Sequence, residues 1–474
     1  MFINGQWIQT QATFSVTNPA TDEEIDRVAD GGTEETRLAI AAAQNAYPAW
    51  SNTTSYERSA YLYRAHQLML QEKQALAELM TREQGKPLKA AAIEVQYGAD
   101  FLLWFAEEAK RIYGETIPSS RSNQRFLVHR QPVGIVGAIT PWNYPVSMIT
   151  RKIAPALAAG CTVVLKPAEA TPLSAIALFK IFEKAGIPEG VVNLVTAADP
   201  IPVGHELCTN PAIRKITFTG STRVGRLLAT AAAPQLKRVS MELGGHAPFI
   251  VFDDANPVHA AKGAALIKFL NTGQACICPN RIYVHRRILT PFLETLSKRI
   301  AAMQAGNGLE KGIAIGPLVN QAALDKVANQ VDDALAKGAK LLVGGNRIVE
   351  KGLEKGFFYA PTLLSEVTPE MLIYREETFG PVAAVIPFDD NDDIINMAND
   401  TDYGLAAYIY TNNINRAMRT FEQLKFGMVG INDINPTSAA APFGGIKQSG
   451  LGREGARAGL EEYLDTKLAG IVLS

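Results

Sequence analysis

The sequence has few of the features that mark specialised classes of protein. Its 474 residues include four cysteines and six scattered histidines, which excludes a disulfide framework and provides no cluster of metal ligands. The formal net charge of -1 gives no electrostatic footprint for nucleic acid or for an anionic membrane. We therefore expect a small-molecule partner and no bound metal.

No stretch of the sequence is apolar for long enough to span a bilayer. Residues 1–7 lack a basic start followed by an apolar run, so we expect a cytoplasmic protein. With 47% hydrophobic and 20% charged residues, the chain can bury a large core and should divide into two or three domains.

A Gly-x-Gly-x-x-Gly motif is also missing from the first strand-to-helix turn, so the usual dinucleotide fingerprint cannot be claimed. The pattern of strands and helices still permits a nucleotide. Lys166 and Glu169 place a cation and an anion directly after an expected strand, and nucleotides commonly bind at the carboxyl ends of parallel strands.

Two patterns organise the chain. Residues 34–113 are rich in Ala, Glu, Leu and Lys with helical apolar spacing, which predicts packed surface helices. From residue 133, short apolar runs alternate with helical segments, as is typical of parallel strands with crossover helices. The expected strands cover residues 135–139, 161–165, 191–195 and 213–218 in a first group and 281–284, 340–343, 383–387 and 405–410 in a second.

Two more segments are expected to form strands outside these groups. Residues 125–130 follow a polar turn, and residues 467–473 lie near the end of the sequence. Small strand elements outside a core need a partner. We therefore expect these strands to project outward.

Cys276 and Glu242 are the most informative residues. A deprotonated thiol is a strong nucleophile, and a carboxylate shielded from water can act as a general base near neutral pH. Cys276 follows the polar, glycine-containing stretch Asn271-Thr272-Gly273-Gln274, which fits a turn that delivers a side chain to a cleft. Glu242 ends a probable strand before two glycines. The structural alternatives are a core cysteine and a solvated strand-end glutamate.

At these residues the sequence resembles the aldehyde dehydrogenase superfamily, and within it the succinate-semialdehyde dehydrogenase-like branch. The resemblance runs nearly from end to end, and several motifs in the same order are far more specific than any one of them. Besides Met241-Glu242-Leu243-Gly244-Gly245 and the Cys276 segment, the motifs are Pro141-Trp142-Asn143-Tyr144-Pro145, Lys166-Pro167-Ala168-Glu169, Phe218-Thr219-Gly220-Ser221-Thr222, Glu376-Glu377-Thr378-Phe379-Gly380-Pro381 and Pro442-Phe443-Gly444-Gly445.

The resemblance implies an α/β fold with two Rossmann-like parallel-sheet domains and a small β oligomerisation element. The expected NAD-binding domain is discontinuous and covers residues 1–113 and 133–244. The catalytic domain, which carries the nucleophile, covers residues 245–444, and the bridging element covers residues 114–132 and 455–474. A homodimer or homotetramer that acts on an aldehyde is expected.

The resemblance also implies roles in cofactor binding. Lys166 and Glu169 contact the adenosine ribose, and a carboxylate there accepts a hydrogen bond from a ribose hydroxyl but repels a phosphate, which favours NAD over NADP. Trp142 is either core filler or a wall of the nicotinamide pocket. The residues expected to hold the pyrophosphate and the nicotinamide are Gly220, Ser221, Gly225, Glu377 and Phe379.

The chemistry of an aldehyde predicts the mechanism. The Cys276 thiolate adds to the carbonyl, and the Asn143 amide and the Cys276 backbone N–H stabilise the new alkoxide. Hydride transfer leaves a thioester, which Glu242 hydrolyses by deprotonating a water molecule. Lys152 and Glu454 match a proton-relay pair of the family. Asn143 has a structural alternative, because it could simply form a turn before a helix.

Substrate choice is where the sequence departs from the branch. Its members hold a distal carboxylate with two arginines and a serine, and the corresponding residues here are Leu270, Arg151 and Thr437. Leucine cannot replace the charge and geometry of an arginine. The other expected pocket residues are Trp104, Tyr144, Ile277 and Phe443. We therefore expect an apolar aliphatic or aromatic aldehyde, with succinic semialdehyde, held by Arg151, as the alternative.

Three rival functions are weighed against this mechanism. A CoA-acylating relative normally lacks the glutamate base, so Glu242 argues against it. A phosphorylating glyceraldehyde-type enzyme pairs its cysteine with a histidine, which the sequence does not offer beside Cys276. A binding protein without turnover would not need Cys276, Glu242 and Asn143. Cys278 is either a small buried residue or a redox switch that traps Cys276 as a disulfide.

Overall fold

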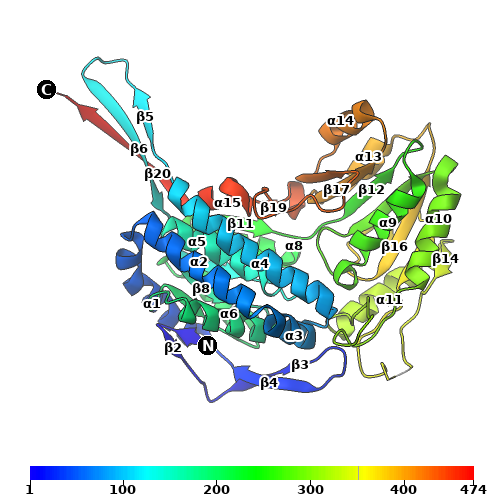
Figure 1. Ribbon diagram of the computed structural model, residues 1–474, viewed down its shortest axis with the longest axis horizontal. Coiled ribbons are helices and arrows are strands. Elements are labelled where there is room, and N and C mark those ends of the chain that lie inside the picture. Colours follow the sequence, from blue (N-terminus) through cyan, green and yellow to red (C-terminus); the bar gives the residue numbers. More distant parts are fainter. Residues whose placement is uncertain (351, 474) are drawn as a thin grey trace.

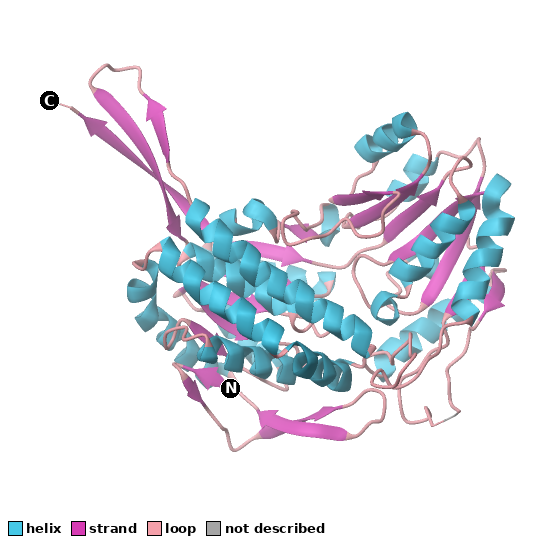
Figure 2. Cartoon of the chain, in the orientation of Figure 1, coloured by secondary structure: helices cyan, strands magenta, loops and turns pink. Residues whose placement is uncertain are grey.

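The protein is described by a computed structural model over residues 1–350 and 352–473. Figure 1 shows two lobes, each built on a sheet flanked by helices, and a narrow arm of strands that projects from the first lobe. Figure 2 shows that helices cover the strands of both lobes, whereas the arm consists of strands and connecting loops. The α/β fold expected from the sequence is confirmed.

The first lobe contains an eight-stranded sheet. Its strands are β1 (Phe2–Ile3), β2 (Gln6–Trp7), β7 (Ile135–Ile139), β8 (Thr162–Lys166), β9 (Val192–Leu194), β10 (Ile213–Thr219), β11 (Arg238–Glu242) and β19 (Gly450–Leu451). They lie in the order β19-β11-β10-β7-β8-β9-β1-β2. The five central strands are parallel, and β1, β2 and β19 are antiparallel additions. All four expected strands of the first group are confirmed to within one residue at each end.

Helices cover the strands of this sheet. They are α1 (Thr33–Ser51), α2 (Ser55–Gln71), α3 (Lys73–Gln84), α4 (Leu88–Glu108), α5 (Ser147–Ala159), α6 (Pro172–Lys184), α7 (Pro200–Thr209) and α8 (Thr222–Ala232), with short 3-10 turns η1 (Ala109–Arg111) and η2 (Ala233–Gln235). Every residue of β8 is buried, as expected for a parallel strand with helices on both faces. The helices expected in residues 34–113 are confirmed.

Helix α5 has an unusual environment. It contacts β7 and β8 on one side and α2 and α4 on the other, and all 13 of its residues are buried. The helix carries Arg151 and Lys152. Because burying an unpaired charge is very costly, both side chains must have partners inside the protein.

The second lobe contains a seven-stranded sheet. Its strands are β12 (Ala247–Val251), β13 (Pro279–His285), β14 (Lys340–Val343), β15 (Thr362–Ser365), β16 (Val382–Phe388), β17 (Ala406–Tyr410) and β18 (Met428–Ile431), in the order β14-β15-β16-β13-β12-β17-β18. Its helices are α9 (Pro257–Lys268), α10 (Arg286–Ala301), α11 (Gln321–Ala336), α12 (Leu372–Arg375), α13 (Ile394–Asn399) and α14 (Ile414–Gln423). The four strands expected here are confirmed, and β14 is antiparallel to its neighbour.

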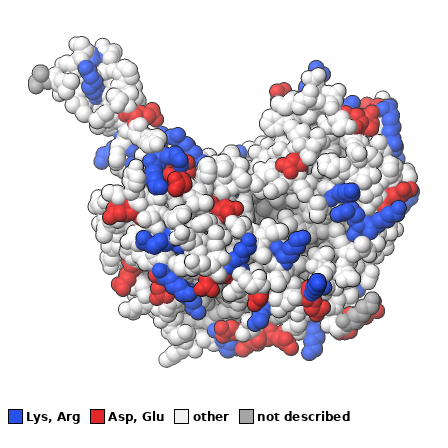
Figure 3. Space-filling view, viewed as in Figure 1, with Lys and Arg blue, Asp and Glu red and all other residues white. Residues whose placement is uncertain are grey.

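The arm is a three-stranded sheet in the order β20-β6-β5, made of β5 (Glu115–Pro118), β6 (Gln124–Pro132) and β20 (Leu464–Val472). Both strands expected here are confirmed, and they pair antiparallel over nine residues, from Leu464↔Pro132 to Val472↔Gln124. Strand β5 was not expected. The arm exposes apolar residues, among them Leu468, which is 61% exposed, and Val472, which is 62% exposed. The arm is mostly uncharged in Figure 3.

Three elements remain. The hairpin of β3 (Thr13–Thr17) and β4 (Glu24–Ala29) packs Val16 and Val28 against Leu173 at the start of α6, and α15 (Ala456–Glu461) contacts α4 and α5. The chain crosses between the lobes directly after Glu242, because β11 ends there and β12 begins at Ala247. Within the described ranges, no helix is long and apolar enough to cross a membrane.

Candidate active site

Cys276 follows a tightly held turn. The 3-10 turn η3 (Leu270–Gly273) contains Asn271 and Thr272 in left-handed conformations, with φ of 49° and 59°. Such residues are strained unless their surroundings hold them. The Thr272 hydroxyl accepts a hydrogen bond from the N–H of Gly316 at 2.9 Å, and a side chain at Gly273 would overlap the carbonyl of Gly380. The sequence predicted this turn, and these contacts hold it in place.

The Cys276 side chain is half-buried and lines a cavity of about 270 Å³. Asn143 lines the same cavity, and its Nδ2 donates to the carbonyl of Gln274 at 2.9 Å. Burial raises the pKa of the Cys276 thiol, and the positive charge of Arg151 opposes that rise. The resting group is therefore a thiol that needs a base to become a nucleophile.

Glu242 lies at the carboxyl end of β11 with 3% of its surface exposed. Neither carboxylate oxygen accepts a hydrogen bond from the part of the chain that the structure describes. A side chain at Gly444 would overlap the Oε1 of Glu242. Burial and then the charge of Glu454 raise the pKa of Glu242 well above its ordinary value. A carboxyl group with a raised pKa is suited to general-base chemistry near neutral pH.

Glu454 is the partner of the two cations on α5. Its carboxylate forms an ion pair with Lys152 Nζ and lies 3.1 Å from Arg151 Nε. Burial opposes ionisation of Glu454, but Lys152 and Arg151 outweigh it and lower the pKa. Lys152 Nζ also donates to the hydroxyl of Thr219 at 2.7 Å. The structure thus brings together Lys152 and Glu454, which the sequence linked as a relay pair, and adds Thr219.

The cavity beside Cys276 also contains most of the residues expected to hold the cofactor. Its lining residues are Pro141, Trp142, Asn143, Met148, Thr219, Gly220, Ser221, Leu243, Gly244, Cys276, Ala323, Lys326, Glu377, Thr378 and Phe379. Trp142 and Phe379 meet edge to face with ring centroids 5.7 Å apart. The Glu377 carboxylate accepts from the N–H of Gly245 at 2.9 Å, and the buried Thr378 hydroxyl has no partner among the described residues.

The glycines of this region fit a close approach to a ligand. Ser221 caps the amino end of α8, where unpaired N–H groups and the helix dipole favour a phosphate. A side chain at Gly220 would overlap the Phe218 ring, and one at Gly225 would overlap Leu243. Lys166 Nζ pairs with Glu169 at 2.8 Å at the end of β8. These residues therefore fit a dinucleotide such as NAD(P).

The residues expected to bind the substrate come from both lobes. Leu270, Ile277 and Phe443 belong to the apolar core of the second lobe, and Trp104 packs against the core of the first. The Arg151 guanidinium lies 3.9 Å from the centroid of the Phe443 ring. Thr437 is half-buried and donates to the Asn435 side chain at 2.9 Å within its own loop.

Several buried donors on α4, on α5 and in the turn before α5 have no acceptor in the described chain. They are Arg151 Nη2, the hydroxyls of Tyr97 and Tyr144, and Trp104 Nε1. Tyr97, Phe101 and Trp104 share one face of α4 by their spacing of four and three residues, and Phe101 lies 5.4 Å from the Arg151 guanidinium. Sequence reasoning missed Tyr97, although its helical spacing from Trp104 was visible.

Cys278 is buried, and its thiol donates to the carbonyl of Ile267 at 3.2 Å. Burial raises the pKa of Cys278 to about 11. A redox role for Cys278 stays a prediction. Among the residues that the structure describes, no group of three or more His, Cys, Asp and Glu side chains could hold a metal ion.

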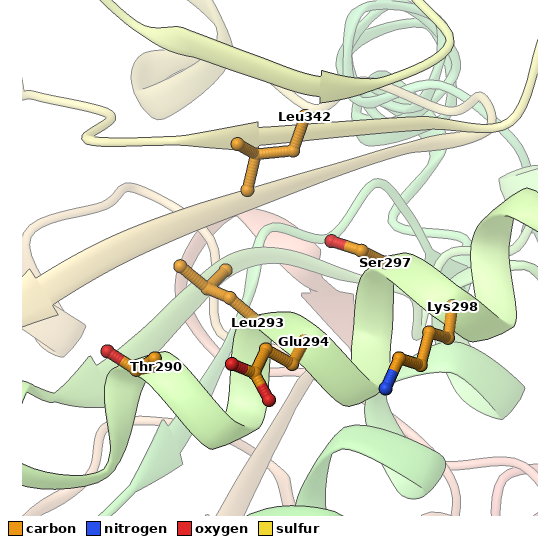
Figure 4. Close-up of a pocket in the computed structure, with 6 residues that line it drawn as sticks. All are labelled: Thr290, Leu293, Glu294, Ser297, Lys298 and Leu342. Carbon is orange, nitrogen blue, oxygen red and sulfur yellow. The ribbon is translucent and has the colours of Figure 1, made fainter.

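A second hollow of about 630 Å³ lies between α10 and the edge strand β14, far from Cys276 in the sheet order. Figure 4 shows its lining side chains, Thr290, Leu293, Glu294, Ser297, Lys298 and Leu342. Its lining contains no cysteine, and we assign it no chemistry.

Comparison with known proteins agrees with the geometry. The aldehyde dehydrogenase family model matches residues 7–469. A probable succinate-semialdehyde dehydrogenase [NADP(+)] of Sinorhizobium fredii is 52% identical, with 96% of this chain and 92% of the relative covered. A glutarate-semialdehyde dehydrogenase of Pseudomonas putida is 50% identical, with 98% and 96% covered.

Among solved structures, an aldehyde dehydrogenase from Brucella melitensis biovar abortus superposes with a TM-score of 0.97 at 49% identity, covering 100% of this chain and 97% of that chain. The motifs that suggested the resemblance are thus part of a match over almost the whole sequence. The chain belongs to the aldehyde dehydrogenase family, in its succinate-semialdehyde dehydrogenase-like branch, and is an enzyme that oxidises aldehydes.

Proposed function

We propose that Cys276 is the nucleophile of this aldehyde dehydrogenase and that Glu242 is its general base. The observation that carries this proposal is the single cavity in which a half-buried thiol and the Asn143 amide lie beside the expected cofactor residues. The buried Glu242 carboxylate, which lacks hydrogen-bond donors, lies at the point where the chain crosses between the lobes. A thiol, a fixed donor and a base are what addition to a carbonyl requires.

The chain's own residues perform the remaining steps. Cys276 Sγ bonds to the carbonyl carbon while its proton passes to Glu242, and the resulting alkoxide accepts hydrogen bonds from Asn143 Nδ2 and from the Cys276 N–H. NAD(P), when bound, supplies the hydride acceptor. Lys152 and Glu454 carry the thiol proton outward, so that Glu242 is ionised again. Glu242 then deprotonates the water that attacks the thioester left by hydride loss. The carbon–sulfur bond breaks, the carboxylic acid is released, and the Cys276 sulfur leaves as a thiolate that regains a proton from Glu242.

Specific residues of this chain hold the cofactor in this proposal. Lys166 and Glu169 bind the adenosine ribose, Gly220 and Ser221 face the pyrophosphate with Gly225 behind them, and Trp142, Glu377 and Phe379 surround the nicotinamide end. We infer that NAD is favoured, because Glu169 would repel a 2′-phosphate. The Sinorhizobium fredii relative is named as NADP-dependent, so the preference needs a direct test.

The substrate that the site supports best is an aldehyde with a distal carboxylate, such as succinic semialdehyde. Arg151, Tyr97, Tyr144 and Trp104 contribute buried donors without acceptors, and buried donors in native proteins almost always have one. A substrate carboxylate would accept hydrogen bonds from these donors.

An apolar aliphatic or aromatic aldehyde is the second candidate. Leu270 replaces an arginine of the branch, and the wall that it forms with Ile277 and Phe443 is apolar. Arg151 is 1% exposed and already paired with Glu454, which limits what it can offer to a substrate. Thr437 offers a hydroxyl in place of the serine of the branch.

We further propose that the protein is a cytoplasmic homo-oligomer, a dimer or a tetramer. A thiol nucleophile must stay reduced, which suits a reducing compartment. The arm, which comprises β5, β6 and β20, exposes apolar residues on a narrow sheet that needs a covering partner. The division into an NAD-binding domain, a catalytic domain and a bridging element is part of this proposal.

The Glu242→Gln variant tests the base. The pKa of Glu242 is raised by burial, and the ionised form is the active one, so wild-type kcat should fall as pH drops through a value well above the ordinary glutamate range. In Glu242→Gln, kcat should fall by about 10² to 10⁴, and this acid limb should disappear. Retention of the limb in the variant would assign the titration to another group.

The substrate proposal is tested by comparing kcat/KM for succinic semialdehyde, butanal, octanal and benzaldehyde. Succinic semialdehyde should be preferred. Leu270→Arg should lower its KM by about tenfold, because a charged hydrogen bond is worth about 1.5–3 kcal/mol, while butanal is unaffected. Leu270→Met is the matched control. A tenfold preference of the wild type for an apolar aldehyde would support the second candidate instead.

The cofactor preference depends on the charge of Glu169. Wild-type kcat/KM should be higher with NAD than with NADP. In Glu169→Gln, kcat/KM with NADP should rise by about tenfold, equivalent to about 1.4 kcal/mol, whereas Glu169→Asp, which keeps the charge, should not show this gain. Equal or better use of NADP by the wild type would refute the preference.

The oligomer is tested at the arm. A protein that carries Leu468→Asp and Val472→Asp should sediment as a smaller species than the wild type, because the two charges would lie in the proposed interface. Ile201→Asp, at an exposed position of α7 outside the arm, is the matched control. A monomeric wild type, or a double variant that assembles normally, would contradict the proposal.

A further inference from the structure

Lys86 and Glu94 form a buried ion pair that the catalytic scheme does not use. They are 1% and 2% exposed, and Lys86 Nζ donates to Glu94 Oε2. Lys86 lies between α3 and α4, and Glu94 lies within α4. A buried pair of this kind often stabilises a protein no better than two apolar residues of the same volume. Stability alone therefore does not explain the pair, and its other hydrogen bonds show which parts of the chain it holds.

Glu94 binds the amino end of α5. Its Oε1 accepts from the N–H groups of Val146 and Ser147 at 3.0 and 3.1 Å. These N–H groups lie at the start of a helix, where they have no partner within the helix. Since α4 packs along α5 in Figure 1, Glu94 fixes where the helix that carries Arg151 and Lys152 begins.

Lys86 binds the turn that precedes α5. Its Nζ donates to the carbonyl of Asn143 at 2.7 Å and lies 4.1 Å from the centroid of the Tyr144 ring. The same carbonyl accepts from Asn271 Nδ2 at 2.9 Å, and Asn271 belongs to the turn before Cys276. Lys86 and the nucleophile turn therefore hold one carbonyl between them.

The Asn143 side chain is held as well. Its Nδ2 donates to the carbonyl of Gln274 at 2.9 Å, and Gln274 Nε2 in turn donates to the carbonyl of Pro317 at 3.2 Å. Asn143 is therefore tied to Lys86 through its backbone and to the Cys276 segment through both backbone and side chain. A shift of the Asn143 carbonyl would move the amide relative to the thiol.

We propose that Lys86 and Glu94 are positioning residues that hold the Asn143 amide beside Cys276. The inference rests on the proposed role of Asn143 as the donor to the alkoxide. Neither residue touches the reacting atoms; both act through the turn at residues 143–147. Misplacement of a catalytic group by about 1 Å can cost about 100-fold in rate, so the pair should matter for turnover more than for binding.

The test uses Lys86→Met, Glu94→Gln and the protein that carries both changes. The double variant removes both charges, so it leaves no unpaired buried charge and keeps the test open where one single variant fails to fold. We expect kcat to fall by about 10- to 100-fold, with KM for NAD and for the aldehyde changed less than about threefold. Glu83→Gln is the matched control, since Glu83 is a buried glutamate that binds the N–H groups of Leu173 and Ser174 at the start of α6.

Coupling to Asn143 separates positioning from general stability. In the Asn143→Ala protein, adding Lys86→Met should lower kcat by less than about threefold, because residues that act as a unit are not additive. A fall in kcat by the same factor when Lys86→Met is made in the wild type and in the Asn143→Ala protein would overturn the proposal. So would a lower melting temperature with kcat within about twofold of the wild type. A wild type that oxidises no aldehyde would instead refute the proposed function.

Discussion

The buried charges around α5 are the constraint on which the site depends. All 13 residues of this helix are buried, and it brings Arg151 and Lys152 into a region of low dielectric constant. Glu454 forms ion pairs with both cations, and the same two cations lower the pKa of Glu242 against the effect of burial. Burial raises the pKa values of Cys276 and Glu242, and the positive charge of Arg151 opposes both rises.

A second network of polar contacts gives the site its geometry. The nucleophile turn, with two residues in left-handed conformations, is held by hydrogen bonds to the segment around Gly316, and the Asn143 turn is held by Lys86 and Asn271. Each group comes from a different stretch of the chain. The proposed catalytic residues are therefore positioned by contacts within each lobe and by the Asn271–Asn143 hydrogen bond between the lobes.

The sequence predicted much of the fold because parallel strands that are covered on both faces are continuous apolar runs, as in β8 and β16. Strands β3, β4 and β5 were missed because most of their residues are exposed, so they lack the continuous apolar run of a buried strand. Motifs singled out Cys276, Asn143 and five proposed cofactor residues, and the structure brings these residues to one cavity. Lys86, Glu94 and Tyr97 could not be assigned in the same way, since a lysine on a surface helix and one that is 1% exposed look alike in sequence.

The central claim is that oxidation proceeds through a thioester on Cys276 that Glu242 hydrolyses. The most direct measurement is peptide mass spectrometry of wild-type protein that is acid-quenched during its first turnover with NAD and the best aldehyde substrate. The account predicts that an acyl group accumulates on the peptide that contains Cys276. An acyl group on another residue, or NADH formation without any acylated Cys276, would contradict it.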